Sequence, residues 1–165
     1  MRESLESLVN VAKMGGMGVT SSTETGGARL DDMVCFALHA ASRAVTATYR
    51  PLLEPLGLTY PQYLVLSALW EQDDRTVGEL VELLQLDYGT MTPLLKRLEK
   101  RGVVQRTRSP DDERTVIVGL TDEGKGMRAD AEGIYQAIVE KFDLTPNRAR
   151  TARKMLQSII DKAND

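Results

Sequence analysis

The chain has 165 residues, with 21 Lys and Arg against 24 Asp and Glu, and 42% of its residues are hydrophobic. This composition predicts one ordinary domain, or a domain with a tail, and excludes a polybasic coat protein and a disordered acidic chain. One cysteine and one histidine exclude an intrachain disulfide and a four-cysteine zinc site. They also argue against a metal cage or a catalytic triad, so we expect no cofactor.

From the hydrophobicity pattern we expect neither a membrane span nor a secretory signal. No run approaches the roughly 18 apolar residues of a membrane span, and the start MRESLESLVN lacks the basic flank and apolar core of a secretory signal. We therefore expect a cytoplasmic protein with no membrane partner. Residues 15–29 hold five of the 13 glycines, so residues 1–30 are expected to form a flexible or weakly helical extension.

Residues 31–72 are expected to form two helices. Apolar side chains recur at helical spacing from Asp31 to Tyr49, and Pro51 is expected to end this first helix. Thr59 and Gln62 then have the spacing of a capping box, in which each side chain satisfies an N–H group at the helix start. This spacing predicts a second helix over the apolar run 63–70.

Residues 73–120 are expected to form a compact lobe of two short helices and a hairpin. A second capping box, Thr76 to Glu79, predicts a helix over 77–84. In the next helix Pro93 is expected to delay the regular start until near Thr90, and Gly102 is expected to stop it. Two alternating runs, 103–108 and 115–120, flank the polar segment 109–114 and predict a β-hairpin.

Residues 121–162 are expected to add two apolar helices that need a surface to pack on. Thr121 is expected to cap one helix of about twenty residues that reaches Phe142. Thr145 and Pro146 have the cap and first-position signature of the last helix.

Basic side chains are concentrated in one segment of this otherwise acidic chain. Residues 96–108 hold six basic residues against one acidic residue, Glu99, which is a local charge of +5. The segment spans the basic helix and the first strand of the hairpin, including Arg97, Arg106 and Arg108. A short helix, a turn, a basic amphipathic helix and a hairpin occur in this order in a winged helix-turn-helix. The predicted fold is therefore mainly α with a small β-hairpin wing, and the predicted partner is double-stranded DNA.

Several motifs are similar to those of a known family. The runs LLKRLEKRGVVQR (94–106), SPDDERT (109–115) and LTDEG (120–124) resemble the MarR family of dimeric bacterial transcription regulators. The runs CFALHAASR (35–43), LTYPQY (58–63) and LDYGTMTPLL (86–95) look more narrowly like its OhrR branch, which senses organic hydroperoxides. The resemblance covers about 31–162 and leaves the first thirty residues unexplained.

The resemblance implies roles for residues of the DNA-binding lobe. It implies an obligate homodimer in which the terminal helices interlock. Asp112 and Arg114 take the places of the wing-tip acid and of the arginine that it fixes for the minor groove. The candidates at the start of the recognition helix are Thr90 and Thr92 for phosphate or base contacts, Lys96 for phosphate, and Tyr88, which either contacts the DNA backbone or packs.

Cys35 is the candidate redox sensor. It lies near a predicted helix start, where N–H groups favour a thiolate, and six of the eight aromatic residues lie between 36 and 88. These aromatic residues, Phe36 among them, suit an apolar pocket around the thiol. The resemblance places Cys35 at the peroxidatic cysteine and Tyr49 and Tyr60 at tyrosines that hydrogen-bond its sulfur. His39 stands where a tyrosine is usual in the family. It replaces that hydrogen bond, or favours the thiolate as a cation, or has no role.

The resemblance implies a reduced dimer that represses from an inverted-repeat operator and is released when an organic hydroperoxide oxidises Cys35. Because no second cysteine exists, a low-molecular-weight thiol, a sulfenamide or overoxidation must complete the switch. One alternative is a repressor of the same fold that is released by a non-covalent phenolic ligand. A thiol peroxidase is the other, but the chain lacks a Thr-x-x-Cys pattern, so we expect no enzyme.

Overall fold

The structure is a computed structural model that describes residues 29–164. The chain consists of two units that divide after Ala37. The described part of the first unit contains a 3-10 helix, Leu30–Asp32, and the start of helix α2 (Val34–Leu53). The extension predicted for residues 1–30 lies outside the described residues, except for Arg29 and Leu30.

Helix α2 differs from its prediction at both ends. It begins at Val34 rather than Asp31, because Asp31 and Asp32 form the 3-10 turn and Met33 has an extended backbone. It also continues past Pro51 to Leu53. A proline inside a helix costs about 3 kcal/mol, but Leu53 is fully buried, and burial of a leucine stabilises by about 1.5–3 kcal/mol. Burial of the last turn therefore offsets most of the cost.

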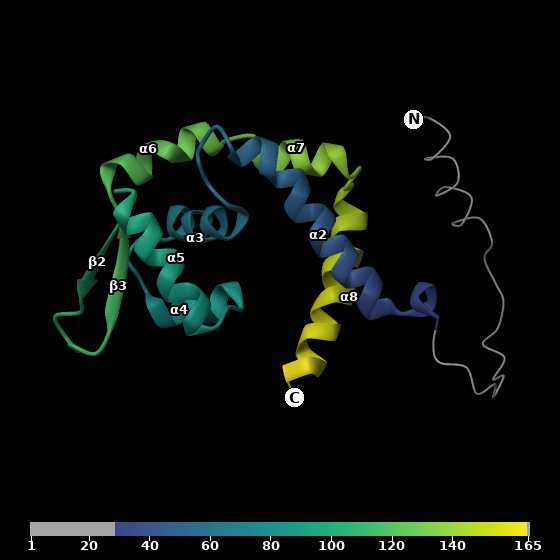
Figure 1. Ribbon diagram of the computed structural model, residues 1–165, viewed down its shortest axis with the longest axis horizontal. Coiled ribbons are helices and arrows are strands. Elements are labelled where there is room, and N and C mark those ends of the chain that lie inside the picture. The colour runs from purple at the N-terminus through teal and green to yellow at the C-terminus, as the bar shows by residue number, and fades with distance from the viewer. Residues whose placement is uncertain (1–28, 165) are drawn as a thin grey trace. The chain divides into compact units, whose positions relative to one another are not determined.

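The second unit contains a helical cluster with a small sheet (Figure 1). Its helices α3, α4 and α5 pack against one another, and the hairpin β2–β3 extends beside α5. In chain order the elements are α3 (Tyr60–Glu71), β1 (Arg75–Thr76), α4 (Val77–Leu84), α5 (Tyr88–Lys100), β2 (Val104–Arg108), β3 (Val116–Leu120), α6 (Asp122–Ala131), α7 (Ile134–Lys141) and α8 (Pro146–Asn164). The predicted class, mainly α with a β-hairpin wing, is confirmed.

The sheet has one strand more than the predicted hairpin. Its order is β1-β3-β2, and all its pairs are antiparallel. The hairpin register runs from Val104 opposite Leu120 to Arg108 opposite Val116. Strand β1 has only two residues, so it was too short to produce an alternating pattern in the sequence.

Both predicted capping boxes are confirmed. The Thr59 backbone N–H donates to Gln62 Oε1 at 2.9 Å, and α3 begins at the next residue. The Thr76 N–H donates to Glu79 Oε2 at 2.7 Å, while the Glu79 N–H donates to Thr76 Oγ1 at 3.1 Å. The Thr76 hydroxyl also donates to Glu79 Oε2, at 2.8 Å, and the bonds to the carboxylate, first that from the Thr76 backbone, hold the pKa of Glu79 below its usual range. Helix α4 consequently has its predicted bounds, residues 77–84.

The helix predicted from Thr121 to Phe142 is two helices. Helix α6 ends at Ala131 and α7 begins at Ile134. Between them Glu132 is extended and Gly133 has a φ of 90°, a left-handed conformation that glycine adopts without strain. The apolar stripe continues on both sides of this break, with Met127, Ile134 and Ile138 buried, so periodicity alone did not reveal it.

The core of the second unit is formed by leucine and valine side chains from the helical cluster and the sheet. Its fully buried members are Leu53, Val65, Leu66, Leu69, Leu80, Met91, Leu95, Leu98, Val103, Val104 and Val118. In contrast, the 19-residue helix α8 contains no buried residue. Among residues 29–164, no helix combines the length and hydrophobicity that crossing a membrane requires.

Gly124 allows α6 to approach the chain just before β2. A Cβ at this position would lie 2.0 Å from the carbonyl oxygen of Val103. We expect Gly124→Ala to destabilise the protein by about 1–3 kcal/mol, because backbone would have to move. Gly126, on the same helix, has nothing within 4 Å of a Cβ, so Gly126→Ala is expected to stabilise by about 0.5–1 kcal/mol. Urea unfolding of both variants tests this, and similar effects would contradict it.

Candidate DNA-binding face and sensor residues

The recognition helix α5 begins at a side-chain cap. Asp87 accepts hydrogen bonds from the Thr90 hydroxyl and from the Thr90 backbone N–H, each at 2.8 Å. The two bonds, with that from the hydroxyl the larger cause, hold the pKa of Asp87 below its usual range. Their stabilisation allows α5 to start at Tyr88, with Pro93 inside it, so the predicted start near Thr90 is wrong. To donate to a phosphate, the Thr90 hydroxyl would have to leave Asp87.

Helix α5 has one buried and one exposed face. Its buried face consists of Met91, Leu94, Leu95 and Leu98. The residues predicted to contact DNA, Tyr88, Thr92, Lys96 and Arg97, are all exposed. Gly102 ends the helix with a φ of +82°, and the backbone N–H of Val103 donates to the carbonyl of Leu98 at 3.2 Å. This termination, which the sequence predicted, turns the chain directly into the wing.

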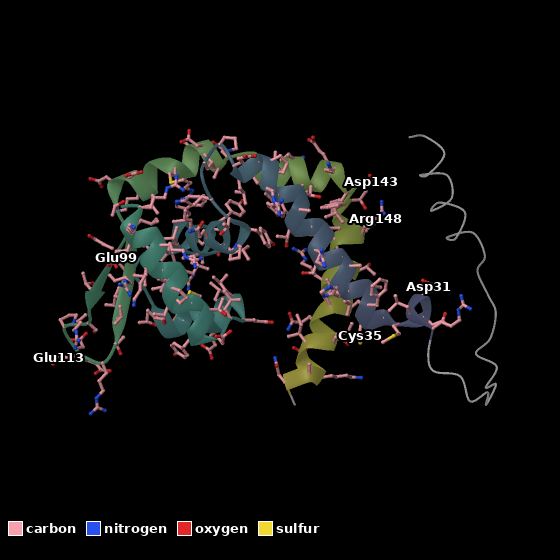
Figure 2. All side chains as sticks on the ribbon, viewed as in Figure 1. Asp31, Cys35, Glu99, Glu113, Asp143 and Arg148 are labelled. Atoms are coloured by element: carbon pink, nitrogen blue, oxygen red, sulfur yellow. The ribbon has the colours of Figure 1, made fainter. Side chains whose placement is uncertain are left out.

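The wing tip is fixed through its backbone. Asp112 accepts hydrogen bonds from the Arg114 backbone N–H at 3.0 Å and from the Thr115 hydroxyl at 2.9 Å. These bonds, first that from the Arg114 backbone, hold the pKa of Asp112 below its usual range. Arg108 donates from Nη1 to the carbonyl of Glu113, which lies at the tip (Figure 2). Asp112 therefore orders the turn that carries Arg114, and within residues 29–164 no carboxylate pairs with the Arg114 guanidinium.

A groove brings several predicted DNA-binding residues together. It has a volume of about 390 Å³ and lies between α4, α5 and the wing. Tyr88 and Thr92 line it from α5, and Arg106 and Arg114 line it from the wing. Arg106 is also paired with Glu99, so its guanidinium is not freely exposed. This continuous surface of helix and hairpin side chains can follow adjoining grooves of a DNA duplex.

The predicted sensor cysteine is exposed at the start of α2. Cys35 is the second residue of this helix, one of the positions whose N–H groups lack a partner within the helix. Phe36 is 41% exposed, and the apolar residues Leu30, Met33 and Val34 before it are exposed as well. His39 is also exposed, four residues further along α2. Because α2 starts three residues later than predicted, Cys35 lies closer to the N-terminus of the helix than the sequence indicated.

The two predicted sensor tyrosines lie against each other in the second unit. The ring centroids of Tyr49 and Tyr60 are 4.5 Å apart, and those of Tyr49 and Tyr63 are 5.9 Å apart. Tyr49 is only 8% exposed. Burial, followed by Tyr60 and Tyr63, raises the pKa of Tyr49 to about 12, and burial also raises the pKa of Tyr60. The sequence did not assign Tyr63 to the site, although its three-residue spacing from Tyr60 in a helix was a usable signal.

The raised pKa of Tyr49 makes a testable contribution to stability. The unfolded chain loses this proton near the ordinary value of 10, whereas the folded protein keeps it until about 12. The contribution is therefore fully present below pH 10 and is lost as the pH rises towards 12. We expect alkaline titration by tyrosinate absorbance to show a last-ionising group near pH 12, later than Tyr60, that Tyr49→Phe removes. Persistence of that group in the variant would contradict the assignment.

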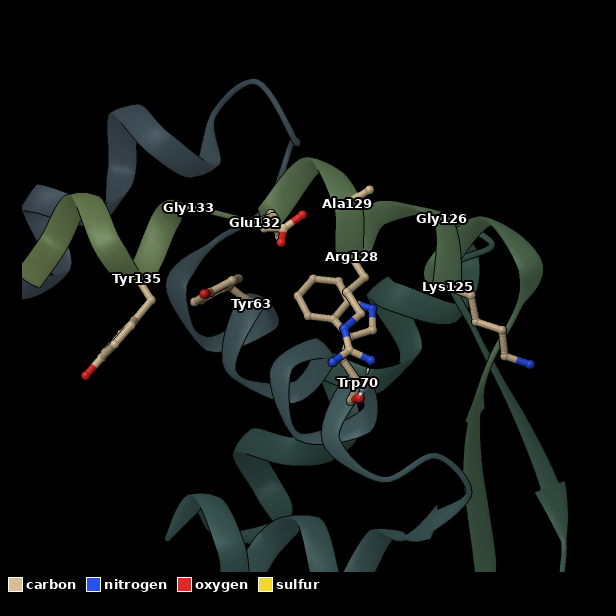
Figure 3. Close-up of a pocket in the computed structure, with 10 residues that line it drawn as sticks. Tyr63, Trp70, Lys125, Gly126, Arg128, Ala129, Glu132, Gly133 and Tyr135 are labelled. Carbon is tan, nitrogen blue, oxygen red and sulfur yellow. Dashed lines mark hydrogen bonds between the residues drawn. The ribbon is translucent and has the colours of Figure 1, made fainter.

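A larger groove lies beside this cluster (Figure 3). It has a volume of about 650 Å³ and is bounded by α3, α6 and the start of α7. Tyr63, Trp70 and Tyr135 contribute aromatic walls. Arg128 donates from Nη1 to the carbonyl of Trp70 at 3.0 Å. Aromatic walls with a guanidinium suit a small aromatic anion. In residues 29–164 no group of three or more His, Cys, Asp and Glu side chains is arranged to hold a metal ion.

The capped helix pair α4–α5, the basic exposed face and the hairpin define a winged helix-turn-helix protein, and comparisons with known proteins identify its family. A family model described as transcriptional regulator SarA/Rot matches residues 47–130. The organic hydroperoxide resistance transcriptional regulator of Bacillus subtilis (strain 168) is 47% identical over 111 residues, which are 67% of this chain and 76% of that protein.

Two solved structures of the Staphylococcus epidermidis protein AbfR are also similar. Reduced AbfR bound to DNA matches with a TM-score of 0.70, and overoxidized AbfR bound to DNA with 0.66. Each is 29% identical, and each match covers 99% of both chains. This chain belongs to the MarR family of winged-helix transcription regulators. It is a regulator that binds DNA, and not an enzyme.

Proposed function

We propose that this protein is a redox-sensing repressor that binds an inverted-repeat operator when reduced and is released when an organic hydroperoxide oxidises Cys35. The observation that carries the proposal is the exposed thiol at the second position of α2. This position occurs in a chain that is 47% identical to an organic hydroperoxide resistance regulator. An exposed thiol is accessible to a peroxide, and the thiolate is the form of a cysteine that attacks it. Like other DNA-binding repressors of bacteria, it acts in the cytoplasm.

The DNA-binding lobe is residues 73–120. Helix α5 enters the major groove through the exposed residues Thr92, Lys96 and Arg97, and the wing carries Arg114 into the neighbouring minor groove. The groove that holds both Thr92 and Arg114 supports this arrangement. In a dimer the two recognition helices are about 34 Å apart, one turn of DNA, which is why the operator is an inverted repeat.

The protein acts as a homodimer held by residues 31–72 and 121–162. Two observations support this assignment. Helix α8 has no buried residue and exposes Met155 by 58% and Leu156 by 41%. Helix α2 exposes Val34 by 56%. Apolar helix faces of this kind are stable in water when a second copy covers them.

The oligomeric state is directly measurable. Sedimentation equilibrium of the reduced full chain is expected to give about twice the monomer mass of 18.3 kDa. Leu156→Glu places a charge on the exposed apolar face and is expected to shift the mass towards the monomer. A monomeric wild type at micromolar concentration would contradict the assignment.

A low-molecular-weight thiol completes the switch. The Cys35 thiolate attacks the terminal oxygen of the hydroperoxide, the O–O bond breaks, and the organic part leaves as the alcohol. The sulfenic acid formed then condenses with a thiol to a mixed disulfide, with the release of water. The existence of an overoxidized AbfR bound to DNA supports the mixed disulfide over overoxidation as the releasing form. Nearly complete release requires about 5.5 kcal/mol of differential stabilisation, and an attached thiol is bulky enough to displace a helix.

Operator binding before and after oxidation tests the proposal. An operator duplex is first selected from a random-sequence library by the reduced protein. We expect fluorescence anisotropy to show tight binding, loss of binding after cumene hydroperoxide with a small thiol, and recovery after dithiothreitol. Hydrogen peroxide at the same concentration serves as the comparison oxidant. Unchanged binding after complete oxidation of Cys35 would overturn the proposal.

A second candidate function is release by a non-covalent aromatic ligand. The groove of about 650 Å³ with Tyr63, Trp70, Arg128 and Tyr135 favours it. The two functions separate in a Cys35→Ser variant, which still responds to a phenolic acid such as salicylate if the groove is the sensor. Insensitivity of wild type and variant to such compounds would eliminate this candidate.

A further inference from the structure

Glu99 and Arg106 connect the recognition helix to the wing. Glu99 lies in the last turn of α5 and Arg106 in the middle of β2, and Figure 2 shows Glu99 on α5 beside the hairpin. Arg106 donates to Glu99 Oε2 from Nε at 3.0 Å and also from Nη2. The two side chains are 25% and 38% exposed, so neither is fully solvated. A guanidinium with two donors on one carboxylate has a defined orientation.

The Glu99–Arg106 ion pair joins α5 and β2 at a second point, beyond the turn that connects them. The chain turns between α5 and β2 at Gly102, and the backbone bond from Val103 to Leu98 fixes only the base of this turn. Arg106 is further along the strand, opposite Val118 of β3. A hydrogen-bonded ion pair at that point restrains the direction of the hairpin relative to α5. The other three ion pairs among residues 29–164 do not join these two elements.

We infer that Glu99 and Arg106 form a positioning pair that sets the angle between the wing and the recognition helix. Arg106 then acts through the position of Arg114 and does not contact a phosphate. This inference rests on the proposed use of α5 and the wing on DNA. It replaces the direct role that the sequence predicted for Arg106, and it adds Glu99, the single acid in the basic segment 96–108, to the functional residues. The bonds from Arg106 lower the pKa of Glu99, which keeps the pair ionised.

Salt titrations of operator affinity distinguish a phosphate contact from a positioning pair, because only the loss of a phosphate contact changes the salt dependence. Loss of a phosphate contact lowers the slope of log affinity against log salt by about 0.9. Loss of the positioning pair weakens operator binding and leaves that slope unchanged. We expect Arg106→Gln and Glu99→Gln each to weaken binding roughly threefold to fivefold with an unaltered slope. The exchange variant E99R/R106E is expected to recover most of the affinity.

The experiment uses the reduced full-length protein, the selected operator duplex and a scrambled duplex. Lys96→Gln calibrates the slope change of a phosphate contact. If Arg106 contacts phosphate, Arg106→Gln lowers the slope, Glu99→Gln binds at least as tightly as wild type, and the exchange variant binds worst. That pattern overturns the inference. Wild type with no preference for the operator would instead refute the proposed function.

Two further measurements distinguish an effect on the position of the wing from an effect on the stability of the protein alone. Circular dichroism melts establish that each variant is folded at the titration temperature. Hydrogen exchange of the free protein is expected to accelerate in β2 and β3 of both single variants and to return to wild-type rates in the exchange variant. Lower melting temperatures with unchanged operator affinity would contradict a positioning role. Unchanged exchange in the hairpin would also contradict it.

Discussion

Replacing Cys35 by serine is expected to give a repressor that still binds its operator and no longer responds to organic hydroperoxide. Serine keeps the size and polarity of the side chain at the exposed second position of α2, but an alcohol does not attack peroxide under conditions in which a thiolate does. We expect oxidation to weaken wild-type binding at least about 100-fold and variant binding less than about twofold. Anisotropy titrations before and after cumene hydroperoxide measure both values.

The control for this experiment separates oxidation of Cys35 from general damage. The chain contains seven methionines, which peroxide also oxidises. Methionine oxidation persists in the serine variant and resists dithiothreitol, whereas a mixed disulfide at Cys35 is reversed. Release of the serine variant by the same dose of hydroperoxide would refute Cys35 as the sensor.

Arg114→Ala is expected to weaken operator binding by about 10- to 100-fold, because an arginine contact with bases or a narrow groove contributes about 1–3 kcal/mol. The turn that carries Arg114 is held by Asp112 through the Arg114 backbone N–H, which the substitution retains. The hairpin is therefore expected to keep its shape, and the rate of Cys35 oxidation is expected to be unchanged. Anisotropy titration and thiol labelling measure the two quantities.

Glu113→Ala provides the matched control at the wing tip. Glu113 is exposed beside Arg114, and its backbone carbonyl, not its side chain, accepts the bond from Arg108. This variant removes an acidic side chain, so operator binding is expected to stay equal or to become tighter. Equal affinities of wild type and Arg114→Ala would refute the minor-groove role of Arg114.

Local signals in the sequence predicted much of the fold. Thr76 and Glu79 form reciprocal bonds over three residues, so a capping box is recognisable from spacing alone. The prolines gave wrong boundaries, because their cost at Pro51 and Pro93 is offset by the burial of Leu53 and by the cap at Asp87. Such compensation depends on tertiary and side-chain contacts. The hydrophobic periodicity of the sequence does not show whether the cost of a proline is offset in this way.

Contacts within the candidate site were less predictable than its residues. Tyr49 and Tyr60 lie against each other, while their hydrogen bonds to the Cys35 sulfur stay a prediction. The partners of Asp112 and Arg106 differ from expectation, because a motif does not specify whether an acid bonds a backbone or a guanidinium. Asp112 bonds the backbone of Arg114, and Arg106 pairs with Glu99.

We hold that the chemical state of Cys35 controls operator binding, and intact-protein mass spectrometry with fluorescence anisotropy on the same sample measures both quantities together. Aliquots are taken during titration with cumene hydroperoxide in the presence of a small thiol. We expect the fraction of released operator to rise in proportion to the fraction of chains carrying one thiol adduct, and to fall with it after dithiothreitol. Release without modification of Cys35, or full modification with the operator still bound, would contradict the claim.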